Sequence, residues 1–103
     1  MTERRILQAR RRSELVTFAH DGIKYHAGIS RFESGEIGEI FLATDKPGSQ
    51  AETVARDAAV VCSIALQFGA PIGTIKHALT RLQDGNGAAG PLGAALALFE
   101  ERA

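Results

Sequence analysis

The sequence has very little sulfur and few aromatic rings. Its 103 residues include one cysteine, one methionine, one tyrosine and no tryptophan. A single cysteine excludes an internal disulfide framework and a zinc site built from several cysteines. Because cytosolic proteins rarely depend on disulfides, we expect a cytoplasmic protein.

A long apolar run is also missing. The longest one, residues 58–68, is interrupted by Ser63 and Gln67 and is too short to cross a bilayer. The first residues are rich in arginine, but no apolar stretch follows them, so they do not resemble a signal peptide. We expect no membrane partner.

Net charge is absent, because twelve basic residues balance twelve acidic ones. The chain as a whole therefore has no field to attract nucleic acid. The first twelve residues differ, since five arginines are opposed there only by Glu3, and such a segment can bind phosphate groups. Chain ends are usually loose, so we interpret residues 1–12 as a flexible basic arm and residues 13–103 as one domain. The arginines are Arg4, Arg5, Arg10, Arg11 and Arg12.

A β-hairpin is predicted around Asp21-Gly22. This dipeptide favours a type I′ turn, in which both central residues have positive φ. A two-residue turn pairs His20 with Ile23, and the same register places the apolar residues of both strands on one face. The further pairs are Phe18 with Tyr25 and Val16 with Ala27.

A third strand is predicted over residues 37–44, after a turn at residues 33–36. If Phe32 pairs with Ile37, then Ile29 pairs with Ile40 and Ala27 with Leu42. The opposite face then carries Phe32, Ile37 and Phe41, an apolar surface that requires a cover. Two candidates are the Ile6/Leu7 segment and a second copy of the chain, so these three residues form the predicted homodimer interface.

Helical signals follow. Ser49 and Glu52 have the spacing of a capping box, which predicts a helix over residues 50–68 ended by Gly69. Pro71 is expected to open a second helix that ends near Arg81, and Pro91 a third helix through Glu101. The predicted fold class is therefore α+β, a three-stranded antiparallel β-meander followed by three helices packed on one face.

The first helix is apolar around much of its circumference. Such a helix is expected at the centre of its domain, covered by the sheet and by other helices. Its apolar stripe consists of Val54, Ala58, Val61, Ala65 and Phe68, with Ala55, Cys62 and Leu66 beside it.

Three segments carry a resemblance to a known family. They are Gly38-Glu39-Ile40-Phe41-Leu42, Lys46-Pro47-Gly48-Ser49, and the apolar helix ending in the run Ser63 to Pro71. In order and spacing, residues 14–101 resemble the TSCPD domain, found at the C-terminus of adenosylcobalamin-dependent (class II) ribonucleotide reductases and in small stand-alone proteins. The Thr-Ser-Cys-Pro-Asp segment itself is replaced here by residues 88–92, Ala-Ala-Gly-Pro-Leu. The resemblance implies an accessory domain rather than a reductase.

An anion site is one interpretation of the turn before the long helix. Lys46, Gly48 and Ser49 surround the helix N-terminus, where free amides and the helix dipole favour phosphate or nucleotide. The alternative is that the Ser49 hydroxyl only caps the helix.

No set of catalytic residues is expected. His20, His26 and His77 lack the spacing of metal ligands, and Cys62 is interpreted as a small core residue. We therefore expect no metal, no cofactor and no enzymatic activity. The predicted function is a non-catalytic accessory, regulatory or interaction domain, as a homodimer, with a ribonucleotide reductase as a further candidate partner. The alternative is a small nucleotide- or nucleic-acid-binding protein that uses residues 46–49 and the arginines.

Overall fold

The computed structural model describes residues 3–9 and 13–101, and it confirms the predicted α+β fold. Three strands form one antiparallel sheet in the order β1-β2-β3, and three helices follow. The strands are β1 (Ser13–His20), β2 (Ile23–Arg31) and β3 (Ile37–Thr44). The helices are α1 (Gln50–Gln67), α2 (Ile72–Ala78) and α3 (Pro91–Glu101).

The first hairpin has the predicted register. His20 pairs with Ile23, Phe18 with Tyr25 and Val16 with Ala27. Asp21 and Gly22 have φ angles of 52° and 76°, the left-handed conformations that a type I′ turn requires.

The second hairpin differs from the prediction at its turn. Ile29 pairs with Ile40 and Ala27 with Leu42 as expected, but the register shifts between Ser30 and Arg31. Arg31 rather than Phe32 is therefore opposite Ile37, so the predicted Phe32–Ile37 pair is wrong. A one-residue shift of this kind re-aims the side chains that follow it.

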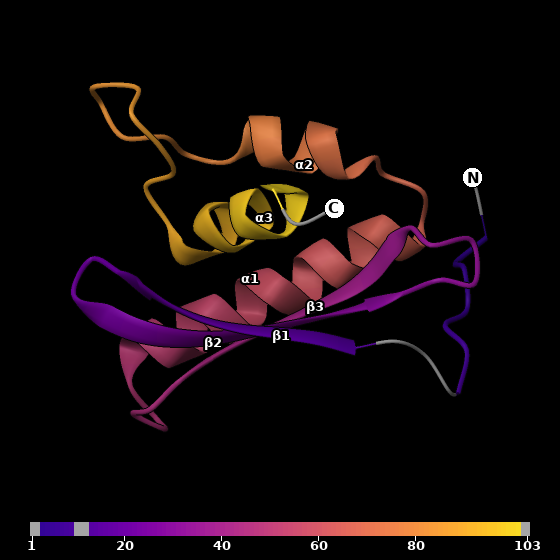
Figure 1. Ribbon diagram of the computed structural model, residues 1–103, viewed down its shortest axis with the longest axis horizontal. Coiled ribbons are helices and arrows are strands. Elements are labelled where there is room, and N and C mark those ends of the chain that lie inside the picture. Colours follow the sequence, from indigo (N-terminus) through magenta and orange to yellow (C-terminus); the bar gives the residue numbers. More distant parts are fainter. Residues whose placement is uncertain (1–2, 10–12, 102–103) are drawn as a thin grey trace.

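The helices take different positions around the sheet (Figure 1). α1 runs along β3, one of the two edge strands of the sheet, and α3 lies against the sheet. α2 lies on the far side of α3 from the sheet (Figure 1). α2 ends at Ala78, short of the predicted Arg81, because Arg81 instead forms an isolated bridge with Ala88.

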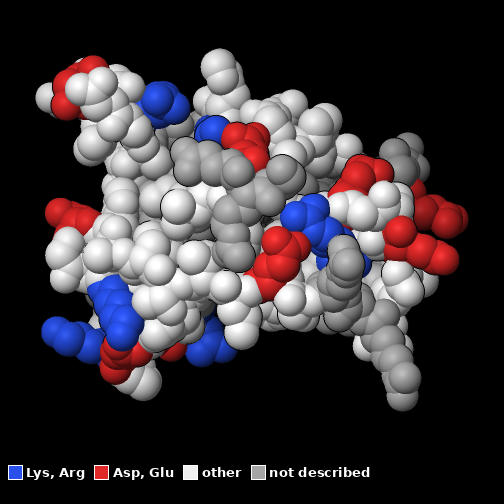
Figure 2. Space-filling model, viewed as in Figure 1, with Lys and Arg blue, Asp and Glu red and all other residues white. Residues whose placement is uncertain are grey.

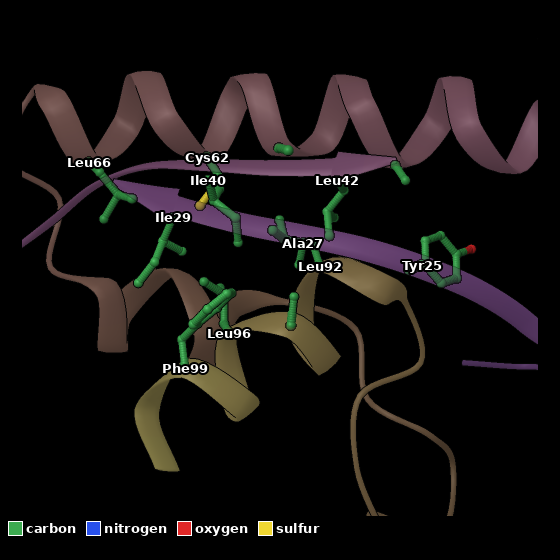
Figure 3. Packing of buried hydrophobic residues seen from close by; sticks show 13 residues of the cluster. Tyr25, Ala27, Ile29, Ile40, Leu42, Cys62, Leu66, Leu92, Leu96 and Phe99 are labelled. Carbon is green, nitrogen blue, oxygen red and sulfur yellow. The ribbon is translucent and has the colours of Figure 1, made fainter. Parts of the chain in front are cut away.

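One apolar core is shared by the sheet, α1 and α3. Figure 3 shows Ile29, Ile40 and Leu42 of the sheet between α1 and the side chains of Leu96 and Phe99 on α3. Apart from Leu66, α1 contributes only small residues, namely Ala55, Ala59 and Cys62. Small side chains let the helix lie close to the strand, while α3 supplies the bulk of the packing.

Charged groups are mixed by sign on the surface. Figure 2 shows basic and acidic side chains intermixed on the face in view, in keeping with a net charge of zero. Among the helices in the described ranges, none has the length and apolarity to cross a membrane.

Candidate functional site

Polar side chains of α1 hydrogen-bond the open edge of β3. The Ile40 amide donates to Ser63 Oγ at 2.9 Å, and the Ser63 hydroxyl donates to the Ile40 carbonyl at 3.1 Å. Gln67 Nε2 donates to the carbonyl of Gly38 at 3.0 Å. An unpaired strand edge exposes backbone groups that need partners. These two side chains supply them over the middle of the strand.

Glu52, near the other end of α1, also hydrogen-bonds the edge of β3. Its carboxylate accepts from the amide and the hydroxyl of Thr44, at 3.4 and 3.2 Å, and from Arg56 at 3.3 Å. The predicted capping box is therefore half correct. Ser49 Oγ does accept the Glu52 amide at 3.2 Å, but the Ser49 amide donates to the carbonyl of Lys46 instead of to Glu52.

These contacts fix the rotation of α1 about its own axis. Because Glu52, Ser63 and Gln67 must face β3, the buried side of the helix is the one that carries them, together with Ala55, Ala59, Cys62 and Leu66. Of the predicted stripe, Val54, Val61 and Phe68 are exposed and Ala58 and Ala65 are half-buried, whereas the residues beside it, Ala55, Cys62 and Leu66, are buried. The expectation of a helix covered all round is wrong, because hydrogen bonds to the strand edge, not apolarity alone, set its orientation.

The outer side of α1 is an exposed apolar row. Val54 is 53% exposed, Val61 67% and Phe68 41%. Val60 and Ile64 are also exposed, beside the row. Next to Val54, a hollow of about 200 Å³ separates α1 from Leu79 and Pro91. An apolar row beside a hollow is the kind of surface that binds another protein. We call Val54, Ala58, Val61, Ala65 and Phe68 the outer row.

The predicted anion site lies in a second hollow. Lys46 and Ser49 line a space of about 380 Å³ together with Lys24 and Asp45. Gly48 makes the turn with a φ of 79°. Lys24 lies 4.0 Å from Asp45, whereas the Lys46 ammonium has no ion-pair partner within residues 3–9 and 13–101. The Ser49 hydroxyl is occupied as the helix cap.

Two of the predicted arginines contact the body of the domain. Arg4 Nε donates to Gln67 Oε1 at 2.6 Å, and the Arg5 amide donates to the Gln67 carbonyl at 2.6 Å. The Arg5 guanidinium lies 3.8 Å from the centre of the Phe32 ring, a cation–π contact. The described part of the predicted arm, residues 3–9, is thus anchored at the end of α1. Arg10, Arg11 and Arg12 lie outside the described residues.

The predicted homodimer surface is not assembled. Phe32 is only 6% exposed, because Arg5 covers its ring and Leu7 approaches from the same side. Ile37 packs against the main core, while Phe41 is 54% exposed on the opposite face of the sheet. After the register shift at Ser30, Phe32 and Ile37 line one cavity, whereas Phe41 lies apart from them on the outer face of the sheet. Of the two covers considered, the N-terminal segment is the one that lies on Phe32.

A cavity of about 340 Å³ opens beside Arg5. Its apolar part includes Phe32, Ile37 and Phe99, and its mouth holds both arginines and acids. The arginines are already engaged: Arg5 lies 3.4 Å from Glu36, and Arg31 Nε donates to Glu14 at 2.7 Å. The cavity therefore offers an apolar space without an unpaired arginine to recognise an anion.

A hydroxyl–imidazole–carboxylate row lies on the outer face of the sheet, and sequence reasoning missed it. Thr17 Oγ1 lies 3.2 Å from His26 Nδ1, and His26 Nε2 is hydrogen-bonded to Asp45. The hydrogen bond from His26 holds the pKa of the Asp45 carboxyl below its ordinary value of 3.8. All three side chains lie in the open, and the hollows beside them are not lined by Thr17 or His26. These three side chains form a surface network that stabilises the Asp45 carboxylate. The cross-strand pairing of Thr17 with His26 could have indicated it.

The single thiol is buried. Cys62 is 3% exposed, and burial raises its pKa to about 11. Within the part of the chain that the structure describes, no three His, Cys, Asp or Glu side chains gather as metal ligands would.

Sequence reasoning also missed the structural roles of Ser63 and Gln67. The signal was present: with Glu52 they lie on one side of a helix that follows an edge strand, in an otherwise apolar stretch. Searches against models of known protein families, curated proteins and solved structures found no match.

Proposed function

We propose that the chain is a non-catalytic interaction domain whose binding surface is the outer row of α1. The observation that carries the proposal is the exposure of Val54, Val61 and Phe68 on one side of a rigid helix. Fully burying such a side chain contributes roughly 1.5–3 kcal/mol. Because Val54, Val61 and Phe68 are about half exposed, a partner that covers them gains roughly half of that from each. Together with the neighbouring hollow, the row offers both a ridge and a groove.

The position of the row supports a binding role. α1 is held along β3 by hydrogen bonds from Ser63 and Gln67, so the outer row is presented on a fixed support rather than on a mobile loop. A pre-organised surface loses little conformational entropy when it binds. The proposal includes the accessory role beside a ribonucleotide reductase that the TSCPD resemblance implies.

Site-specific photo-crosslinking in the native cell tests the proposal. A benzophenone side chain in place of Val61 should give covalent protein adducts on irradiation, because that position would lie inside an interface. The same group in place of Thr17, on the exposed outer face of the sheet, is the control and should give none. Absence of adducts from position 61, or equal adducts from both positions, would contradict the proposed surface.

A second candidate function is anion or nucleotide binding at Lys46. It is favoured by the hollow of about 380 Å³ at the start of α1, whose lining includes Lys24, Lys46 and Ser49 beside one carboxylate, Asp45. Calorimetric titration with pyrophosphate and with a nucleoside triphosphate tests it. Binding should be lost in Lys46→Ala and kept in Lys76→Ala, whose ammonium is paired with Glu100 elsewhere on the surface. A Lys46→Ala variant that binds like the parent would remove this candidate.

A further inference from the structure

The outer row has the spacing of a coiled-coil seam. From Ala51 onward, apolar residues recur at intervals of three and four along the whole of α1, at positions 51, 54, 58, 61, 65 and 68. A seam with this repeat packs against another helix. Small and large residues alternate within it: Ala51, Ala58 and Ala65 are half-buried at its shoulder, while Val54, Val61 and Phe68 project.

How the small and large residues of two copies meet depends on whether the two helices run parallel or antiparallel. When two copies of the seam run antiparallel, Ala58 of one copy meets Val61 of the other, and Val54 meets Ala65. Ala51 and Phe68 complete the series. Each layer of the contact then combines one alanine with one large residue, an alternation that favours close packing. In a parallel pair, alanine would face alanine and Phe68 would face Phe68, which leaves gaps and clashes in turn.

We propose that the partner of the outer row is a second copy of this chain, with the two α1 helices antiparallel about a two-fold axis. This inference rests on the proposed function, because it names the partner of the same surface. The seam matches itself, which is what a two-fold interface requires. Asp57 is the charged residue nearest the row, and Arg56, farther round the helix, is paired with Glu52. Because the seam itself carries no charged residue, no like charges face each other at its centre.

Sedimentation velocity over a range of concentrations tests self-association. The parent is expected to form a dimer in the micromolar range, and Val61→Glu should weaken it about tenfold or more, because it places a charge in a layer of the seam. Leu15→Glu is the matched control: Leu15 is 79% exposed on the outer face of the sheet, so the same change there should leave the dimer intact. A parent that stays monomeric, or equal loss in both variants, would overturn the inference.

Engineered cysteines test the direction. In the double variant Val54→Cys with Ala65→Cys, an antiparallel pair brings position 54 of one copy next to position 65 of the other, so mild oxidation should give a disulfide-linked dimer. Within one helix these positions are about 16 Å apart, too far for a disulfide. Val54→Cys alone should stay unlinked. Cys62 is buried and adds no background. Efficient linking by Val54→Cys alone would show a parallel pair and contradict the proposal.

The two proposals fail in different ways. Photo-adducts from position 61 with twice the mass of the chain support self-pairing. Adducts of another mass, from a chain that sediments as a monomer, would overturn self-pairing and leave the proposed interaction surface in place.

Discussion

Ser63 satisfies both backbone groups of Ile40 at the open edge of β3: its hydroxyl accepts from the Ile40 amide and donates to the Ile40 carbonyl. One side chain thus takes the place of a neighbouring strand at that residue. Because the hydroxyl must point at the strand, it also determines which side of α1 faces water. The exposed outer row is the consequence.

Ser63→Ala should destabilise the domain by about 1–3 kcal/mol, because the amide and carbonyl of Ile40 would be left buried without partners. Urea denaturation measures the change. Thr53→Ala, at an exposed position of the same helix, is the control and should cost no stability, since alanine is the better helix former. Equal unfolding midpoints for Ser63→Ala and the parent would show that the edge contact contributes nothing.

Gly38→Ala should loosen the N-terminal segment. A Cβ at Gly38 would lie 2.7 Å from Phe32 Cζ and 2.8 Å from Leu7 Cδ2, so one of these side chains must move. We expect faster tryptic cleavage after Arg4 and Arg5, followed by mass spectrometry. Gly73→Ala is the matched control: a Cβ there meets nothing within 4 Å, and the helix α2 should gain roughly 0.5–1 kcal/mol. Unchanged cleavage in Gly38→Ala would contradict the contact.

Asp45 should contribute to stability above its ordinary pKa and lose that contribution in acid. Its carboxyl has a lower pKa in the folded protein, because His26 donates a hydrogen bond to it. The unfolded chain therefore takes up the proton first as pH falls. The contribution is full above pH 3.8 and disappears as the pH drops through the lower, folded pKa. In Asp45→Asn the acid-induced loss of stability should be smaller; an identical pH profile would refute the linkage.

Cys62 should resist thiol reagents while the protein is folded. Burial raises its pKa to about 11, so little thiolate is present near pH 8 and the sulfur is also shielded. Reaction with Ellman's reagent should be slow in buffer and fast in concentrated urea. Val61→Cys supplies the comparison, because its new thiol lies on the exposed side of the same helix and should react at once in dilute solution. Rapid labelling of Cys62 in the folded parent would mean that this side of α1 is not buried.

The sheet could be predicted from the sequence because the turn residues and the hydrophobic pattern indicate the same register. Asp21-Gly22 fixes the turn, and the alternation of Phe18, Tyr25 and Ala27 selects the same register as the turn. A pattern with period two leaves a single choice of face, so local and long-range preferences support one structure.

The rotation of α1 was not predictable from apolarity in the same way. Apolar residues lie on every side of the helix, so the hydrophobic pattern leaves its orientation open. Three polar residues decide it, because Glu52, Ser63 and Gln67 bond backbone groups at the edge of β3 that would otherwise be buried without partners. The position of Phe32 escaped prediction for another reason, since the register shift after Ser30 has no clear signal in the residues around it.

Nuclear Overhauser contacts to the methyl groups of Ile40 and Leu42 test most directly how α1 is oriented. We predict contacts from these methyls to the β-protons of Cys62 and Ala59, and none to the methyls of Val54 or Val61. Contacts from Val54 or Val61 to Ile40 or Leu42 would show that the helix is turned the other way, and the outer row would not exist.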